Sequence, residues 1–299
     1  MWFKNLQLYR LPAPWAMTAA QLEEKLSKFT FRRCASNELK TSGWRAPRGE
    51  QPLVYSYNKQ WLLALETEQR LLPASVVNQI TKDRAAELEV QQGFAPGRKQ
   101  LRDLKELVAQ ELMPRAFTRR FTTRLWIDPQ EGWLAVDAGS TTKAEDVLEF
   151  LRRSLGDLPL SLINTELSPV AAMTEWLSTG EAPSGFTVDR DCELKDPGEG
   201  SAVVRYVRHA LDGEDVVQHI AQGKTPTRLA LTWNDRVSFV LSDRLEVKRL
   251  SFLDVVKQDA TDAANAEEQF DSDFTLMTGE LQKFLPELLL ALGGEVKVL

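Results

Sequence analysis

Residues 119–139, RRFTTRLWIDPQEGWLAVDAG, contain the pattern that decides the fold class. Two runs rich in β-branched and aromatic residues flank PQEG at 129–132, where proline and glycine are typical of a turn. The stretch therefore predicts an antiparallel hairpin. Other predicted strands also follow one another without an intervening helix, so the chain is expected to be α+β, with mainly antiparallel sheets and packed helices.

Further strands and helices are predicted on both sides of this hairpin. Strands are predicted at 3–11, in two segments of 52–72, and at 202–209, 227–235, 237–243 and 245–252. Helices are predicted at 19–29, 73–92, 98–112, 141–155, 171–178 and 213–223, and through 270–294. At 299 residues the chain is expected to divide into an N-terminal half, 1–165, and a C-terminal half, 166–299.

Charge is distributed unevenly along the chain, whose net charge is −6. Residues 96–126 carry a local charge of +5, while residues 254–280 carry −7. No acidic residue occurs between positions 111 and 128. Such a basic segment inside an acidic protein indicates a local surface for an anionic partner.

The arginines of this segment suit phosphate, because a planar guanidinium donates paired hydrogen bonds and keeps its charge. In an extended strand, Arg120, Thr122 and Arg124 share one face, while Phe121 lies on the opposite, apolar face. The first face is predicted to bind the partner, and Phe121 to join the core. The alternative is a solvated strand whose arginines pair with acidic residues elsewhere in the chain.

The helix predicted at 98–112 extends the basic surface. Its apolar stripe, expected in the core, consists of Leu101, Leu104, Val108 and Leu112. Arg208, in the strand predicted at 202–209, is a second basic candidate, although charged residues in an edge strand also protect a sheet from aggregation. Phe117 follows a turn and is either buried or an exposed wedge. The candidate contact residues are Arg98, Lys99, Arg102, Arg115, Phe117, Arg119, Arg120, Arg124 and Arg208.

Patterns for catalysis or metal binding are scarce. The two cysteines and two histidines match no zinc-ligand spacing, and phosphate-binding glycine loops and nucleophile motifs are absent from the sequence. Asp271 and Asp273 suit Mg²⁺-dependent nuclease chemistry, but a solvated acidic segment at a helix start is the simpler explanation. No enzymatic activity, cofactor or metal is therefore predicted.

The expected location follows from the same features. Cys34 and Cys192 lie far apart in the sequence, which favours a reducing compartment. Charged residues interrupt the N-terminal segment 1–15, so it does not resemble a signal peptide, and no apolar run reaches about 18 residues. The chain is expected to be cytoplasmic, with no membrane contact.

Several segments, in the same order along the chain, resemble the recombination-associated RdgC family of proteobacteria. They are WFKNLQLYRL (2–11), LMPRAF (112–117), LWID (125–128), KAEDVLEFLRRSLG (143–156), TEWL (174–177), ALTW (230–233), LMTGEL (276–281) and ALGGE (291–295). The resemblance thus extends over essentially the whole chain.

This resemblance implies a nucleoid-associated DNA-binding protein without enzymatic activity. It implies a ring-shaped homodimer whose positively lined hole encircles double-stranded DNA, with little sequence preference, and which restrains the RecA recombinase. Single-stranded DNA is a further candidate ligand. The candidate contact residues then become expected DNA contacts, made to phosphates rather than to bases.

The acidic segment 254–280 is then expected on the exterior, where it discourages DNA from binding the wrong face. The apolar segment 281–294 is expected either at a subunit interface or buried within its own subunit. Two other functions remain open. One is a protein-interaction module that binds the recombinase directly and touches DNA only weakly, and the other is the nuclease that would use Asp271 and Asp273.

Overall fold

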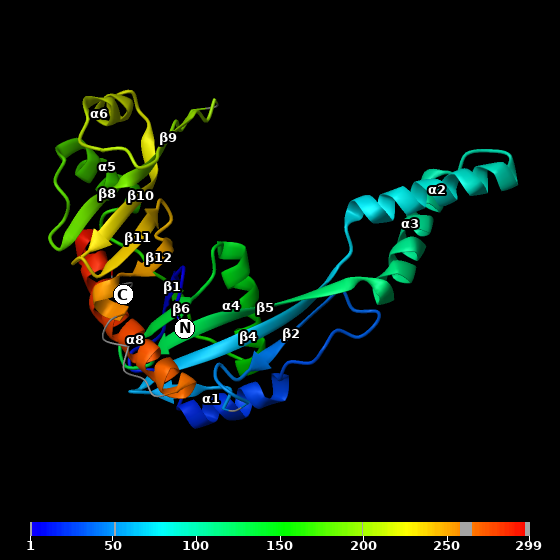
Figure 1. Ribbon diagram of the computed structural model, residues 1–299, viewed down its shortest axis with the longest axis horizontal. Coiled ribbons are helices and arrows are strands. Elements are labelled where there is room, and N and C mark those ends of the chain that lie inside the picture. Colours follow the sequence, from blue (N-terminus) through cyan, green and yellow to red (C-terminus); the bar gives the residue numbers. More distant parts are fainter. Residues whose placement is uncertain (1, 51, 199, 258–264, 297–299) are drawn as a thin grey trace.

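The computed structural model describes residues 2–50, 52–198, 200–257 and 265–296. The chain forms an elongated crescent, with one β-sheet at an end, a second sheet in the middle and a helical hairpin at the other end (Figure 1). Both sheets are antiparallel and both carry helices, so the predicted α+β class is confirmed.

The described N-terminal residues form a seven-stranded sheet in the order β2-β4-β5-β6-β1-β7, with β3 paired to β4. Its strands are β1 (Gln7–Arg10), β2 (Lys40–Arg45), β3 (Tyr55–Tyr57), β4 (Gln60–Leu71), β5 (Phe117–Asp128), β6 (Trp133–Val136) and β7 (Ser161–Leu162). The predicted hairpin is the β5–β6 pair at the centre of this sheet, so that prediction is confirmed.

The turn between β5 and β6 depends on an aspartate and a glycine. The Asp128 carboxylate accepts the backbone N–H groups of Gln130 and Glu131. Gly132 has a φ of +69°, and a Cβ there would lie 2.4 Å from the carbonyl oxygen of Leu11. Glycine is therefore required at this position, because any other side chain would be strained and would collide with backbone.

The described C-terminal residues form a five-stranded sheet in the order β12-β11-β10-β8-β9. Its strands are β8 (Phe186–Lys195), β9 (Val203–Tyr206), β10 (Thr225–Trp233), β11 (Val237–Ser242) and β12 (Val247–Phe252). The helices are α1 (Ala19–Leu26), α2 (Ala74–Gln92), α3 (Arg98–Leu112), α4 (Thr141–Leu155), α5 (Pro169–Thr179), α6 (Glu214–Ala221), α7 (Asp254–Lys257) and α8 (Ala266–Ala291).

Two apolar clusters hold the crescent together. In the first, α1 and α4 cover one face of the N-terminal sheet, with Leu22, Leu26 and Leu151 fully buried. In the second, α5, α8 and the C-terminal sheet pack with the other face of the N-terminal sheet, around Trp126 and Phe284. Because this second cluster includes residues from both sides of position 165, the division into halves remains a prediction.

Helices were expected through 270–294, and a single helix, α8, runs from Ala266 to Ala291 and contains most of the apolar segment 281–294. The buried side chains on this helix include Leu281, Phe284, Leu285 and Leu288. Of the two places expected for this segment, burial within its own subunit is therefore the one observed.

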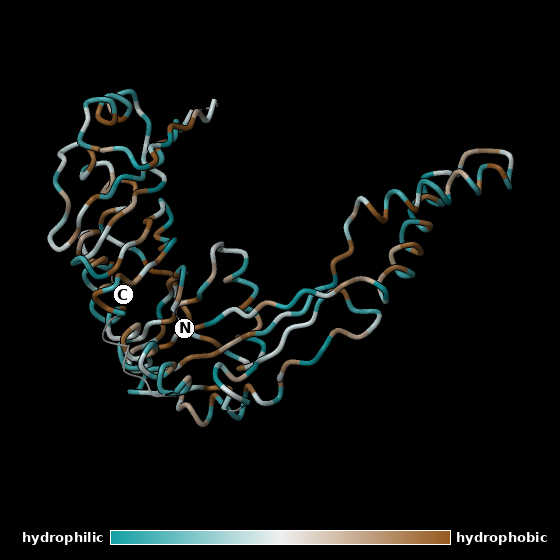
Figure 2. The backbone as a smooth tube through the Cα atoms, viewed as in Figure 1, coloured by the Kyte–Doolittle hydropathy of each residue, from teal (hydrophilic) through white to brown (hydrophobic). Residues whose placement is uncertain are grey.

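Helices α2 and α3 form a hairpin that projects from the end of the first sheet (Figure 1). Only Val77, Thr81 and Val108 are buried among the described residues of these two helices. The predicted core stripe on α3 is thus largely wrong, because Leu101 remains 38% exposed where the hairpin has no sheet beneath it. Apolar residues continue along the projecting tube (Figure 2).

Candidate nucleic-acid interface

Strand β5 arranges its side chains as the alternation predicts. Thr122 pairs with Glu66 on β4 and Arg120 pairs with Glu68, so these side chains share one face of the sheet. Arg119 and Phe121 lie on the opposite face, on the side where β5 packs against α4. Phe121 is only half-buried, beside Lys143, and so is not the core residue that was expected.

Arg120 is neutralised within the sheet. Its Nε donates to Glu68 Oε1 at 2.8 Å, and its Nη1 lies 3.9 Å from Glu66. Both glutamate side chains are almost completely buried. The hydrogen bond from Arg120 lowers the pKa of Glu68 below its ordinary value, with a smaller contribution from the backbone N–H of Cys34. The pairing of arginines with internal acids, which was the alternative interpretation, therefore holds for Arg120.

Arg124 lies deeper in the same face. Its side chain is partly buried, and its Nε has no hydrogen-bond partner within the described part of the chain. Burial raises the pKa of the neighbouring Asp137, and the backbone N–H groups of Lys4 and Asn5 together with the charge of Arg124 partly oppose that effect. Arg124 therefore places a cation on β5 in the N-terminal sheet, close to Asp137 and to the N-terminal residues Lys4 and Asn5.

The other N-terminal candidates lie along the projecting hairpin. Arg98, Lys99 and Arg102 are exposed at the start of α3, and Arg115 is exposed where α3 ends. Phe117 is 84% exposed, which selects the exposed alternative of the two considered for it. These residues thus lie along α3 and the start of β5, on the arm of the crescent formed by the helical hairpin (Figure 1).

Arg208 lies on the opposite arm. Strand β9 ends at Tyr206, so Arg208 is in a turn and not in the predicted strand at 202–209. It has a φ of +54°, and its backbone N–H donates to the Asp191 carboxylate at 2.8 Å. Within one chain the structure does not bring Arg208 together with the hairpin residues (Figure 1).

A cluster that the sequence analysis did not select lies on the C-terminal sheet. One face of this sheet packs against α5 and α8, and the opposite, open face carries charged side chains. There Glu193 on β8 is the cross-strand neighbour of Arg205 on β9 and of Arg228 on β10. We call these three residues the arginine–glutamate ladder. The alternating apolar and charged residues of these strands are the signal that could have found it.

The ladder borders a cleft of about 430 Å³ at the junction with the N-terminal sheet. Lys248 and Arg249 on β12 line the cleft, and Asn5 and Gly139 contribute to it from the N-terminal half. Arg228 and Arg249 are 51% and 76% exposed, and their nearest carboxylates lie 3.9 and 3.6 Å away. These two guanidiniums therefore retain donors for an external anion.

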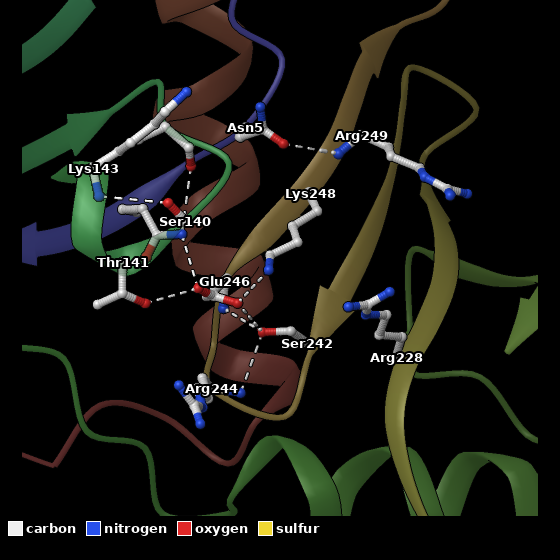
Figure 3. Close-up of polar contacts among 12 residues, drawn as sticks. Asn5, Ser140, Thr141, Lys143, Arg228, Ser242, Arg244, Glu246, Lys248 and Arg249 are labelled. Carbon is white, nitrogen blue, oxygen red and sulfur yellow. Dashed lines mark hydrogen bonds and ion pairs between the residues drawn. The ribbon is translucent and has the colours of Figure 1, made fainter. Parts of the chain in front are cut away.

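A buried glutamate supports this cleft from behind. Glu246 accepts hydrogen bonds from Gln7 of β1, Thr141 of α4 and Ser242 of β11, and it pairs with Lys248 at 2.8 Å. Figure 3 shows Glu246 between the start of α4 and strand β12, with Lys248 and Thr141 directed toward it. This carboxylate joins the two sheets and fixes the position of Lys248.

The acidic segment 254–280 is not simply an exterior surface. Asp271 accepts from both Arg48 and Tyr55, and Glu280, which is almost fully buried, forms a two-pronged ion pair with Arg236. Asp273 is also buried and accepts from Gln269 at 2.8 Å. The outward acidic surface that was expected is therefore wrong for these three residues. Asp259 and Asp262 lie outside the described residues.

The metal-site alternative has little support in this arrangement. Within the described ranges, no three histidine, cysteine, aspartate or glutamate side chains converge as ligands would. The Asp271 carboxylate is already used by Arg48 and Tyr55.

None of the described helices has the length and apolar composition that a membrane span requires.

Comparison with known proteins gives a consistent assignment. The family model described as "Putative exonuclease, RdgC" matches residues 1–295. The chain is 59% identical over 300 residues to the recombination-associated protein RdgC of Dechloromonas aromatica (strain RCB), covering 99% of both chains. It is 57% identical over 296 residues to the protein of the same name from Herminiimonas arsenicoxydans, again covering 99% of both. Because the family model matches residues 1–295 and both relatives cover 99% of the chain, the chain belongs to the RdgC family.

Proposed function

We propose that this protein binds duplex DNA without sequence preference, as a ring-shaped homodimer that encircles the duplex and limits access of the RecA recombinase. The observation that carries the proposal is the cleft on the C-terminal sheet, where the guanidiniums of Arg228 and Arg249 are exposed and lie 3.9 and 3.6 Å from the carboxylates of Glu193 and Asp191, beyond hydrogen-bond length. Backbone phosphates are the matching ligand, because arginine binds them through paired, charge-assisted hydrogen bonds.

Phosphate contacts explain why such binding would not depend on sequence. Each neutralised phosphate releases counterions, and this contribution to affinity is the same for every base sequence. The basic residues lie on both sides of the crescent, with Arg119 on β5 beside the helical hairpin and Arg228 on β10 of the C-terminal sheet (Figure 1). Two crescents with facing arms would enclose a duplex on all sides, and a closed ring would add topological retention to the electrostatic attraction.

The exposed apolar side chains of the α2–α3 hairpin support self-association. Val90 at the end of α2 and Phe94 in the loop between the two helices are 85% and 62% exposed. Large apolar groups gathered on a projecting element are typical of a contact surface. The proposed partner for this surface is a second copy of the chain, because each interface of a two-fold ring is formed by the same surface patch on both subunits.

The first test measures affinity for random-sequence duplexes by fluorescence anisotropy across a salt series. Phosphate contacts predict a linear fall of log affinity with log salt, with a slope of about −0.9 for each neutralised phosphate. Unrelated duplexes should bind equally well, and closed circular DNA should be retained longer than linear DNA. Absence of binding even at low salt would contradict the proposal and favour direct binding of the recombinase.

The family description also makes nuclease activity a necessary control. We expect labelled linear duplex to remain intact with this protein in Mg²⁺ buffer, at the same level as in EDTA. Products that form only with Mg²⁺ would contradict the non-enzymatic proposal. Replacing Asp271 by asparagine would then show whether the candidate carboxylate takes part.

Arg119 and Arg120 should behave differently when each is replaced by alanine. Arg119→Ala should leave the unfolding free energy within about 0.5 kcal/mol of the wild type and reduce the salt slope by about 0.9. Arg120→Ala should lower the urea midpoint of unfolding, because the Glu68 side chain, which lies within the sheet, loses its cation. Urea unfolding and anisotropy measured in parallel separate the two effects. An Arg119→Ala variant with unchanged affinity and slope would remove Arg119 from the interface.

Replacing Val90 by aspartate should weaken self-association by at least about tenfold, because a charge would enter the contact in place of a buried valine. Sedimentation velocity over a concentration series measures this change. Val255→Asp is the matched control, since Val255 on α7 is also exposed, at 48%, but lies outside the hairpin. Equal association of both variants would show that the hairpin is not the contact surface.

A further inference from the structure

The arginine–glutamate ladder contains a carboxylate where an external anion would be expected to bind. Glu193 lies on the middle of three adjacent strands, between Arg205 and Arg228. Its Oε2 accepts from Arg205 Nε at 2.6 Å and lies 3.9 Å from Arg228 Nη1, while its Oε1 accepts from Thr227 at 2.9 Å. One carboxylate therefore interacts with both arginines of the ladder.

The environment keeps this carboxylate ionised. Partial burial raises the pKa of Glu193, but the hydrogen bonds from Arg205 and Thr227 and the charge of Arg228 outweigh burial and leave the pKa below its ordinary value. The Glu193 side chain is only 15% exposed, whereas those of Arg205 and Arg228 are 68% and 51% exposed. The negative charge thus lies at the sheet surface, beneath two cations that extend into solvent.

A phosphate in the adjoining cleft would bind to the same two arginines. A guanidinium has five N–H groups, and Glu193 engages Arg205 through Nε. A phosphodiester bound to either arginine would lie close to the Glu193 carboxylate, and two negative charges at such a distance repel each other. Glu193 therefore opposes phosphate binding by occupying Nε of Arg205 and by repulsion beside both arginines.

The other carboxylates near the cleft do not have this position. Glu246 is buried and joins β1, α4 and β11 through hydrogen bonds, so its function is structural. Asp191 accepts a hydrogen bond from the backbone N–H of Arg208, which fixes the turn after β9, and its carboxylate also lies 3.6 Å from Arg249. Only Glu193, among these three, lies between two exposed arginines in direct cross-strand register.

We propose that Glu193 is an internal competitor for backbone phosphate, which weakens the hold of Arg205 and Arg228 on DNA. This inference rests on the proposed function and adds a limit to the affinity of that same surface. A protein that encircles DNA needs weak local contacts if it is to move along the duplex, because retention then comes from the closed ring.

The test replaces Glu193 by glutamine, which removes the charge but keeps one oxygen to accept from Arg205, while the amide N–H₂ can donate to the Thr227 hydroxyl. Affinity for a random duplex at low salt should rise about fivefold, and the salt slope should become steeper by about 0.9, as for one additional neutralised phosphate. Adding Arg228→Ala to Glu193→Gln should cancel most of this gain. Thermal unfolding of each variant checks that the fold is retained.

Glu175→Gln is the matched control, because it makes the same change of net charge on α5, which packs against the opposite face of the sheet. If both glutamine variants bind DNA equally, the competition by Glu193 is overturned while DNA binding itself stands. If neither the wild type nor Glu193→Gln binds duplex at low salt, the proposed function and this inference both fail.

Discussion

Replacing Glu246 by alanine should destabilise the protein by about 3 kcal/mol or more, because the change leaves a buried site without its carboxylate. Glu246 is only 7% exposed and accepts hydrogen bonds from elements of both sheets. In its absence the Lys248 ammonium loses its 2.8 Å partner, and the buried Gln7 amide loses its closer acceptor, at 3.0 Å, and keeps only the Ala138 carbonyl at 3.5 Å. Unsatisfied buried polar groups are costly, so the junction between the sheets should weaken.

Urea unfolding followed by circular dichroism measures this loss. Glu175→Ala is the control, because Glu175 is exposed on a helix and its removal should change stability by no more than about 0.5 kcal/mol. Equal unfolding free energies for the two alanine variants would show that Glu246 does not hold the sheets together.

The same site should contribute to acid sensitivity. Burial raises the pKa of Glu246, but hydrogen bonds from Lys248, Gln7 and Thr141 and the charge of Lys248 outweigh it, so the folded-state pKa lies below the ordinary 4.5. A carboxyl group whose pKa is lower in the folded state than in the unfolded state stabilises the fold at pH values above its unfolded-state pKa. This contribution is lost as the pH falls from about 4.5 through the folded-state pKa. Stability measured below about pH 5 should therefore fall less steeply for Glu246→Gln than for the wild type.

Removing both Arg228 and Arg249 should have the largest effect on DNA affinity. The double alanine variant should bind a random duplex at least about tenfold more weakly, and its salt slope should be shallower by about 1.8, as expected for two lost phosphate contacts. Folding should be unaffected, because both side chains are more than half exposed and their nearest carboxylates lie 3.9 and 3.6 Å away.

Anisotropy across a salt series measures the change, with the Arg32→Ala/Arg33→Ala double variant as the control. Arg32 and Arg33 are exposed before β2, so this control removes the same charge outside the cleft. A general effect of net charge would weaken both double variants equally, and that result would show that the cleft does not contact DNA.

Local patterns were sufficient for much of the fold. Alternation in 119–139 predicted the β5–β6 hairpin because side chains in a strand point to opposite faces. The α4 helix at 141–155 followed from its apolar spacing, and in the structure Ser140 caps it by accepting a hydrogen bond from the backbone N–H of Lys143. Strands β2 and β8 were not predicted, since KTSGWR contains glycine and serine and FTVDRDCELK is rich in charge.

The α+β class, the positions of most helices and strands, the polarised charge and the RdgC family could all be inferred from local patterns in the sequence. The tertiary structure alone decided which arginines are available. Arg120 is neutralised because strand register places it opposite Glu68, 52 residues away in the chain. Arg228 gains its neighbours because β8, β9 and β10 pair side by side. A sequence pattern gives the face that each side chain occupies, but its charged neighbours depend on which distant strands pair and in what register.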